Sequence, residues 1–182
     1  TAISTPMREG ILYELDTRLR PSGKSGAPTV SIDSYATHHM ERAHTWEHIA
    51  LVPSRVVLGS SEVSARINQL KADVLTRPRD ETQFLHDALK MWARISEHRI
   101  DDTVLHDMNS KLRVGGLMQA EYLASCLVLK NGSQLNPSAM EFDVLLANAL
   151  KDSGLEELPE VIQFWRIQQL WERLLGLSLI HI

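Results

Sequence analysis

The residues best placed for chemistry lie in the stretch 11–23, which reads ILYELDTRLRPSG. In a strand, alternate side chains point to opposite faces. With that period one face of the stretch is apolar, and the other carries four charged residues. These are Glu14, Asp16, Arg18 and Arg20. Two carboxylates at i and i+2 can hold a cation such as Mg²⁺ together with substrate phosphates, and arginine binds phosphate bidentately. The pattern therefore allows a metal and phosphate site, or an exposed edge strand whose charges pair with one another.

A second candidate is the H-x-x-E-H spacing of His44, Glu47 and His48. On one helix the two histidines would lie a turn apart and could bind zinc while Glu47 activates water, as in inverted zinc peptidases. Three specified residues arise easily by chance in a chain with eight histidines, and the spacing identifies no third ligand. A helix surface with ordinary polar packing is the competing interpretation.

A third candidate is the single acid of the segment 117–129, LMQAEYLASCLVL. A helix that is apolar nearly all round is a buried helix, and buried acids need partners. Glu121 should therefore contact an arginine, a metal ion or a water-filled site, either as a structural brace or in a functional role. The apolar surroundings of Cys126 argue against a nucleophilic thiol there.

The charged strand needs neighbouring elements to hold it. Pro21 should end it, since proline cannot donate to a sheet ladder. A short strand at 30–32 could follow, and then one helix that is capped by Asp33 or Ser34 and runs toward Ala50. A lone strand cannot form a sheet, so we expect that its partner strands are not in this chain.

The remaining sequence predicts helices with clear boundaries. Ser60 or Ser61 opens the first, and Asp80 with Gln83 resembles a capping box at the start of the next. Further helices are predicted over 117–129, from 136 to 154, and from Pro159 onward. The last helix should turn a broad apolar face to the core, formed by Val161, Trp165, Ile167, Leu170, Trp171 and Leu174.

Composition narrows the function classes. The chain has 182 residues, 43% of them hydrophobic, with a formal net charge of -4 and a pI near 6.0. No basic field for nucleic acid and no apolar run of membrane-spanning length is present in the sequence. The single cysteine agrees with a reducing compartment. We expect a soluble protein that binds neither nucleic acid nor membrane. The final residues, LSLIHI, resemble a translated transposon adaptor, and we expect 177–182 to be an artefact.

Three motifs in order resemble one family. LYELDTRLRPSG, TWEHIALVPSRVV and GGLMQAEYLASCLVL resemble the adenylyltransferase of bacterial glutamine synthetase, over about residues 7–176. The wording is most similar to the C-terminal, adenylylating half. The resemblance implies two nucleotidyltransferase domains of the DNA polymerase β type, each followed by helices. One attaches AMP from ATP to a tyrosine of glutamine synthetase, and the other removes it by phosphorolysis.

The resemblance also implies roles for the charged strand. Asp16 would be the third metal-binding carboxylate, with Glu14 supporting it, and Arg18 and Arg20 would hold phosphate or fix Asp16. Mg²⁺ would bridge the triphosphate of ATP and align the tyrosine hydroxyl for attack on the α-phosphorus. The first two carboxylates come from a G-S-D-x-D motif that these 182 residues do not contain. We therefore expect this polypeptide alone to be inactive.

The fold expected from the resemblance is mainly α, and α+β in the intact protein. Residues 1–32 would be the edge of a nucleotidyltransferase domain and 33–176 a helical bundle. Glu47 belongs to the family's W-E-H wording and Glu121 to its third motif, where Gln119 replaces a usual aspartate; both acids are candidates for supporting roles. Expected partners are glutamine synthetase and a PII-type nitrogen signal protein, in the cytoplasm. A helical interaction module without chemistry is the main alternative.

Overall fold

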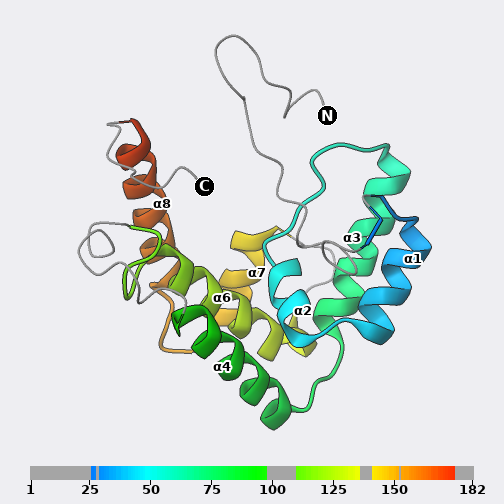
Figure 1. Ribbon diagram of the computed structural model, residues 1–182, viewed down its shortest axis with the longest axis horizontal. Helices are drawn as coiled ribbons and strands as arrows, with labels where there is room; N and C mark the ends of the chain where they lie inside the picture. The colour runs from blue at the N-terminus through cyan, green and yellow to red at the C-terminus, as the bar shows by residue number, and fades with distance from the viewer. Residues whose placement is uncertain (1–25, 28, 98–109, 136–140, 152, 175–182) are drawn as a thin grey trace. The chain divides into compact units, whose positions relative to one another are not determined.

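The computed structural model of the chain describes residues 26–27, 29–97, 110–135, 141–151 and 153–174 (Figure 1). All secondary structure in these residues is helical, which confirms the prediction of a mainly α chain. The chain divides into two compact units, Thr1–Arg42 and Ala43–Ile182. The predicted edge strand, residues 11–23, lies outside the described residues, and the predicted domain limits stay a prediction. Among the helices that are described, none is long and apolar enough to cross a membrane.

The described part of the first unit is one short helix that changes its winding. The helix α1 (Ile32–Thr37) continues into the π-helical turn η3 (His38–Arg42). Ser31 caps α1, because its Oγ accepts a hydrogen bond from the backbone N–H of Ser34 at 3.1 Å. Two expectations were wrong here: Ile32 begins a helix instead of ending a strand, and the helix does not run on to residue 50.

The second unit begins with a separate helix start at His44. Its helices are α2 (Thr45–Leu51), α3 (Ser61–Thr76), α4 (Glu81–Glu97), α6 (Leu117–Lys130), the short 3₁₀ turn η4 (Gly132–Gln134), α7 (Phe142–Leu150) and α8 (Leu158–Leu174). The predicted cap at Ser60 is confirmed, and at Asp80 the N-cap half of the predicted capping box is confirmed, while the Gln83 side chain donates to Asp87. Ser60 Oγ accepts from the N–H of Val63 at 3.3 Å, and Asp80 Oδ1 accepts from that of Gln83 at 2.7 Å.

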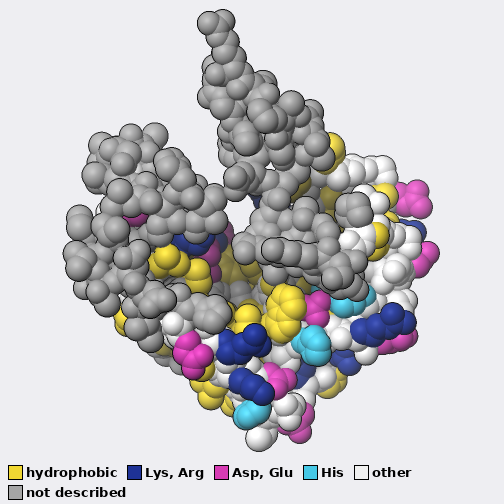
Figure 2. Space-filling model, viewed as in Figure 1, with side chains coloured by type: hydrophobic (Ala, Val, Ile, Leu, Met, Phe, Trp, Pro, Cys, Tyr) yellow, Lys and Arg dark blue, Asp and Glu magenta, His cyan; other side chains and the backbone are white. Residues whose placement is uncertain are grey.

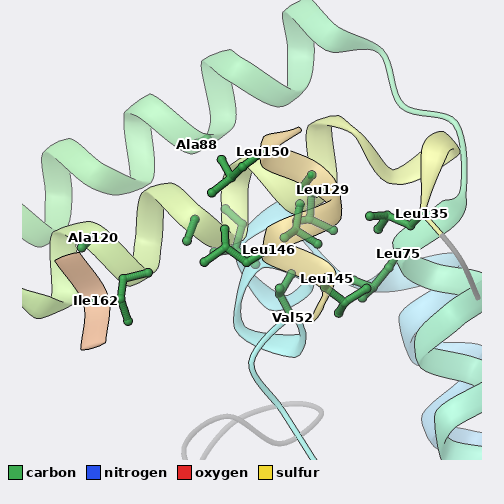
Figure 3. Packing of buried hydrophobic residues seen from close by; sticks show 14 of the residues in the cluster. Val52, Leu75, Ala88, Ala120, Leu129, Leu135, Leu145, Leu146, Leu150 and Ile162 are labelled. Carbon is green, nitrogen blue, oxygen red and sulfur yellow. The ribbon is translucent and has the colours of Figure 1, made fainter. Parts of the chain in front are cut away.

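The core of the second unit forms around α6, which contacts α2, α3, α4, α7 and α8. Its small and aliphatic residues pack against two leucines of α7, Leu145 and Leu146, which are 0% and 1% exposed (Figure 3). Each fully buried leucine contributes about 1.5–3 kcal/mol relative to an exposed one. Polar ties add to this packing: Tyr122 donates to the carbonyl of Ala88 at 2.8 Å, and the Asn131 amide to that of Ala149 at 2.6 Å.

The C-terminal ends of α3 and α6 meet at Arg79. One guanidinium nitrogen, Nη1, lies 3.0 Å from the carbonyl oxygen of Leu75 and 3.5 Å from that of Leu129, and Nη2 donates to Val74. Gly132 makes this close approach possible, since a Cβ at that position would lie 2.0 Å from the Leu75 carbonyl oxygen. The two helix ends therefore share one cation and have no room for a side chain between them.

The last helix, α8, differs from its prediction. It packs on α6 and α7 through Leu158, Ile162 and Trp165. Four other residues of the predicted core face are 41–56% exposed, and the side chain of Leu174 is not described. These exposed residues are Val161, Ile167, Leu170 and Trp171. The prediction of a single broad core face was therefore wrong: α8 is apolar on two sides, and only one of them is packed.

Candidate functional site

The residues with the clearest predicted chemistry lie outside the described residues. Glu14, Asp16, Arg18 and Arg20 belong to the stretch 1–25, for which the structure gives no geometry. The structure does describe the contacts of the two supporting candidates, Glu47 and Glu121, and two cavities of the second unit.

Glu47 begins a helix. It is the third residue of α2, and its Oε2 accepts a hydrogen bond from the backbone N–H of His44 at 2.8 Å. This bond satisfies one of the N–H groups that a helix start leaves unpaired. His44 is the N-cap of α2: its backbone is extended, and its carbonyl oxygen accepts a hydrogen bond from the backbone N–H of His48 at 3.3 Å. Among the described residues, no three histidine, cysteine or acidic side chains are grouped to hold a metal ion. The geometry does not support the zinc hypothesis.

Glu121 is paired with an arginine, which is one of the three partners expected for it. Nε and Nη2 of Arg166 donate to Glu121 Oε1 at 3.1 and 3.0 Å. The third guanidinium nitrogen lies 3.6 Å from a carboxylate oxygen of Asp143, and the guanidinium carbon is 5.5 Å from the ring centre of Phe142. Arg166 of α8 thus connects α6 and the start of α7. The Glu121 and Arg166 side chains are 37% and 36% exposed, so solvent screens the pair.

Gln119, at the position where the family resemblance leads us to expect an aspartate, has a local role in starting α6. Its side-chain oxygen accepts a hydrogen bond from the backbone N–H of Gly115 at 2.8 Å. Gly115 has a φ of 75°, a conformation that glycine adopts without strain. The longer glutamine side chain reaches back over one turn to this N–H. Glu121 makes its hydrogen bonds with Arg166, so these contacts do not involve position 119.

A polar cavity with a volume of about 1060 Å³ lies in the second unit. It lies between the loop after α2, the first half of α3, the start of α7, and Arg166 of α8. Arg55 lines one wall, and Glu141 and Asp143 line another. The loop is held by Lys71, whose Nζ donates to the carbonyl of Ser54 at 2.7 Å. Burial lowers the pKa of Lys71 to about 8.

A smaller cavity of about 270 Å³ lies between α2 and α4. Its acid, Asp87, is engaged within the protein, since the Thr45 hydroxyl donates to Oδ2 at 2.8 Å and the Gln83 amide to Oδ1 at 2.9 Å. The hydrogen bond from Thr45 is the main reason that the pKa of Asp87 is lowered.

On the face seen in Figure 2, basic, acidic and histidine side chains of the described residues are intermixed.

Sequence reasoning missed the partner of Glu121. Arg166 is the only charged residue between Val161 and Trp171, and a lone cation in an apolar helix is itself a signal of a buried or paired site. That signal could have identified Arg166, but it could not have identified Asp143 or Phe142, which come from a different helix.

Comparison with known proteins points to one class. The sequence family described as glutamate-ammonia ligase adenylyltransferase matches residues 1–70, which include both the charged stretch 11–23 and the W-E-H segment. Curated relatives named bifunctional glutamine synthetase adenylyltransferase/adenylyl-removing enzyme match most of the chain. The relative from Rhodopseudomonas palustris strain TIE-1 is 33% identical over 147 residues, 81% of this chain and 14% of the relative. Those from Shewanella woodyi and Brucella suis are 37% and 34% identical over 73% and 81% of this chain.

The matched family and the relatives are named for adenylyl transfer, so the class to which this chain is similar is that of the adenylyltransferases. The chain belongs to the glutamate-ammonia ligase adenylyltransferase family, as the three ordered motifs predicted. It spans about one seventh of the length of the curated relatives, 14% of those from Rhodopseudomonas palustris and Shewanella woodyi and 15% of that from Brucella suis.

Proposed function

We propose that this chain contributes one strand of the active site, together with the helical region after it, to an enzyme that transfers AMP from ATP to a tyrosine of glutamine synthetase. The observation that supports this most strongly is the family match over residues 1–70, which contains the segment LYELDTRLRPSG. The names of the relatives support glutamine synthetase as the protein substrate. A PII-type signal protein as a further partner, and the cytoplasm as the location, belong to the same proposal.

In this proposal the chemistry rests on Asp16. Its carboxylate is one ligand of Mg²⁺, with Glu14 supporting it, while Arg18 and Arg20 bind phosphate oxygens or orient Asp16. When bound, Mg²⁺ neutralises charge on the phosphates of ATP. One carboxylate cannot by itself hold the metal ions of such a site. The 182 residues contain no G-S-D-x-D motif to supply the others, so the chain alone does not transfer AMP.

The helical unit has a supporting role. The contacts of Glu47 and Glu121 are with a helix start and with Arg166, and both are contacts that hold helices in place. We assign these acids to positioning and not to proton transfer or metal binding. This assignment separates the residues that act on ATP, which lie on the charged strand, from those that keep the helical unit in one arrangement.

Transfer of labelled AMP tests the proposal. This chain, incubated with glutamine synthetase, Mg²⁺ and ATP labelled in the α-phosphate, should leave the synthetase unlabelled. A family polypeptide that carries both this segment and the G-S-D-x-D motif should label it. The change Asp16→Asn in that polypeptide should then abolish labelling while the fold persists, as judged by circular dichroism. Unchanged labelling would favour the alternative of an interaction module without chemistry.

A further inference from the structure

The side of α8 that faces away from α6 and α7 is apolar and exposed. We call it the outer face of α8. It consists of Val161, Phe164, Ile167, Leu170 and Trp171, which are 41%, 58%, 46%, 56% and 55% exposed. They recur at spacings of three and four residues, as the residues of one side of a helix do. Helix α8 stands at one side of the helical unit, next to α6 (Figure 1).

The outer face carries no charge. The only charged residue from Val161 to Trp171 is Arg166, and its guanidinium is directed toward Glu121 and Asp143. The solvent-facing side of an ordinary surface helix carries charged or polar residues, whereas the centres of protein interfaces are depleted of charge and enriched in aromatic residues. The composition of this face is therefore that of a contact surface.

The exposed area is too large for scattered surface residues. Aromatic side chains bury about 150–250 Å² each, so Phe164 and Trp171 at half exposure, with three aliphatic neighbours, leave several hundred Å² of apolar surface, interrupted only by the uncharged Gln163 and Gln168. Patches of that size on soluble proteins mark interaction sites. The opposite side of the same helix is already packed by Leu158, Ile162 and Trp165, so the two apolar sides have separate partners.

We propose that the outer face of α8 binds an amphipathic helix from a part of the family polypeptide outside this segment. The relatives place about six sevenths of their length outside the matched region, so a polypeptide of that length has ample further chain from which a covering helix could come. A second copy of this chain is the less favoured partner for the outer face. It would bury on the order of 1,000 Å² in total, the lower limit for a specific interface between separate molecules. A tethered segment needs less area because its effective concentration is high.

The geometry specifies this partner further. The outer face extends over eleven residues, about 16 Å or three helical turns. A helix that packs along it would place aliphatic side chains at i, i+3, i+4 and i+7 between Phe164, Ile167 and Trp171. Opposite Phe164, Ile167 and Trp171 the partner should carry no charged residue, because the only charged residue from Val161 to Trp171, Arg166, is already paired with Glu121.

The test compares the accessibility of Trp171 in two settings. In the first, the isolated chain is exposed to hydroxyl radicals. In the second, the same residues replace the matched region of the Rhodopseudomonas palustris relative. Oxidation of Trp171 should be about fivefold slower in the chimera, because its exposure would fall from 55% to that of an interface centre. Leu89, which is 68% exposed on α4, is the internal control and should be oxidised equally in both.

Two variants and one further measurement decide between occupants. In the chimera, Phe164→Glu should restore oxidation of Trp171, and Leu89→Glu should not. The isolated chain should sediment as a monomer up to several hundred micromolar. Equal oxidation of Trp171 in the two settings would overturn the proposal. So would a dimer of the isolated chain that Phe164→Glu dissociates, because the occupant would then be a second copy. Sedimentation gives this answer even if the chimera does not fold.

Discussion

The ion pair between Glu121 and Arg166 gives a measurable test of whether Glu121 is a brace. Glu121→Gln keeps the shape of the side chain and removes its charge, and Arg166→Met keeps the aliphatic stem and removes the guanidinium. A buried pair with two charge-assisted hydrogen bonds would contribute about 1.5–3 kcal/mol. More than a third of each side chain is exposed, so screening by water should reduce the coupling to about 1 kcal/mol.

The two single variants should differ in cost. Arg166→Met also removes the approach to Asp143 at 3.6 Å and the stacking on Phe142, so it should lower the free energy of unfolding by about 2 kcal/mol, against about 1 kcal/mol for Glu121→Gln. For a chain of this size, 1 kcal/mol corresponds to about 2–4 °C in Tm. The double variant should cost less than the sum of the two single variants.

Urea unfolding followed by circular dichroism measures all four proteins of this cycle. The matched control is the pair of Glu81 and Lys130, which is as close, at 2.9 Å, but 62% and 43% exposed. Its coupling should be below about 0.5 kcal/mol. A coupling between Glu121 and Arg166 no larger than that of the control would refute the reasoning. If Glu121→Gln left stability unchanged but abolished AMP transfer by an active family polypeptide, Glu121 would instead act in the chemistry.

Three further predictions concern steric fit and titration. Gly132→Ala should lower the free energy of unfolding by about 3 kcal/mol, because its Cβ would overlap a backbone carbonyl. The control is Gly59→Ala, whose Cβ would lie 3.4 Å from its nearest neighbour, in Val63, and which should cost less than about 0.5 kcal/mol. Equal Tm values for the two variants would contradict the prediction. The pKa of Lys71 is lowered from 10.5 to about 8, so the folded state binds fewer protons between these values and stability gains with rising pH there. The measurement compares the unfolding free energies of wild type and Lys71→Met across that pH window. The variant is needed because the raised pKa of Cys126 makes stability fall with rising pH and so opposes the effect of Lys71. Burial raises the pKa of Cys126 to about 11, so its thiol should react with a disulfide reagent at pH 8 only after unfolding, and rapid labelling of the native chain would oppose this.

Helix boundaries could be predicted because their causes are local. Ser60 and Asp80 each accept a hydrogen bond from a backbone N–H three residues on, and that geometry depends only on the residues of one turn. The mainly α class followed from the same signals. The family could be predicted because three motifs occur in the family's order. A hydrophobic pattern alone would not produce these motifs, so their order is specific to the family.

Contacts between distant residues could not be predicted in this way. Apolar spacing predicted one broad buried face on α8, but it cannot distinguish residues that pack on α6 from residues whose partner is elsewhere. The early end of α1 at Thr37 depends on the π-turn at 38–42, for which the sequence carries no strong signal. Arg166 could have been suspected as the partner of Glu121, whereas Asp143 depends on where α7 begins relative to α8.

The meeting of α3 and α6 at Arg79 has an electrostatic consequence for the helical unit. The C-terminal end of each helix carries a partial negative charge of roughly half an electron, and two such ends brought together would repel. Burial lowers the pKa of Arg79 to about 10, so the guanidinium still carries its charge at neutral pH. Arg79 is thus a built-in counter-ion for two converging dipoles. A lysine could supply the charge but not the fork that reaches the carbonyls of Val74, Leu75 and Leu129 together.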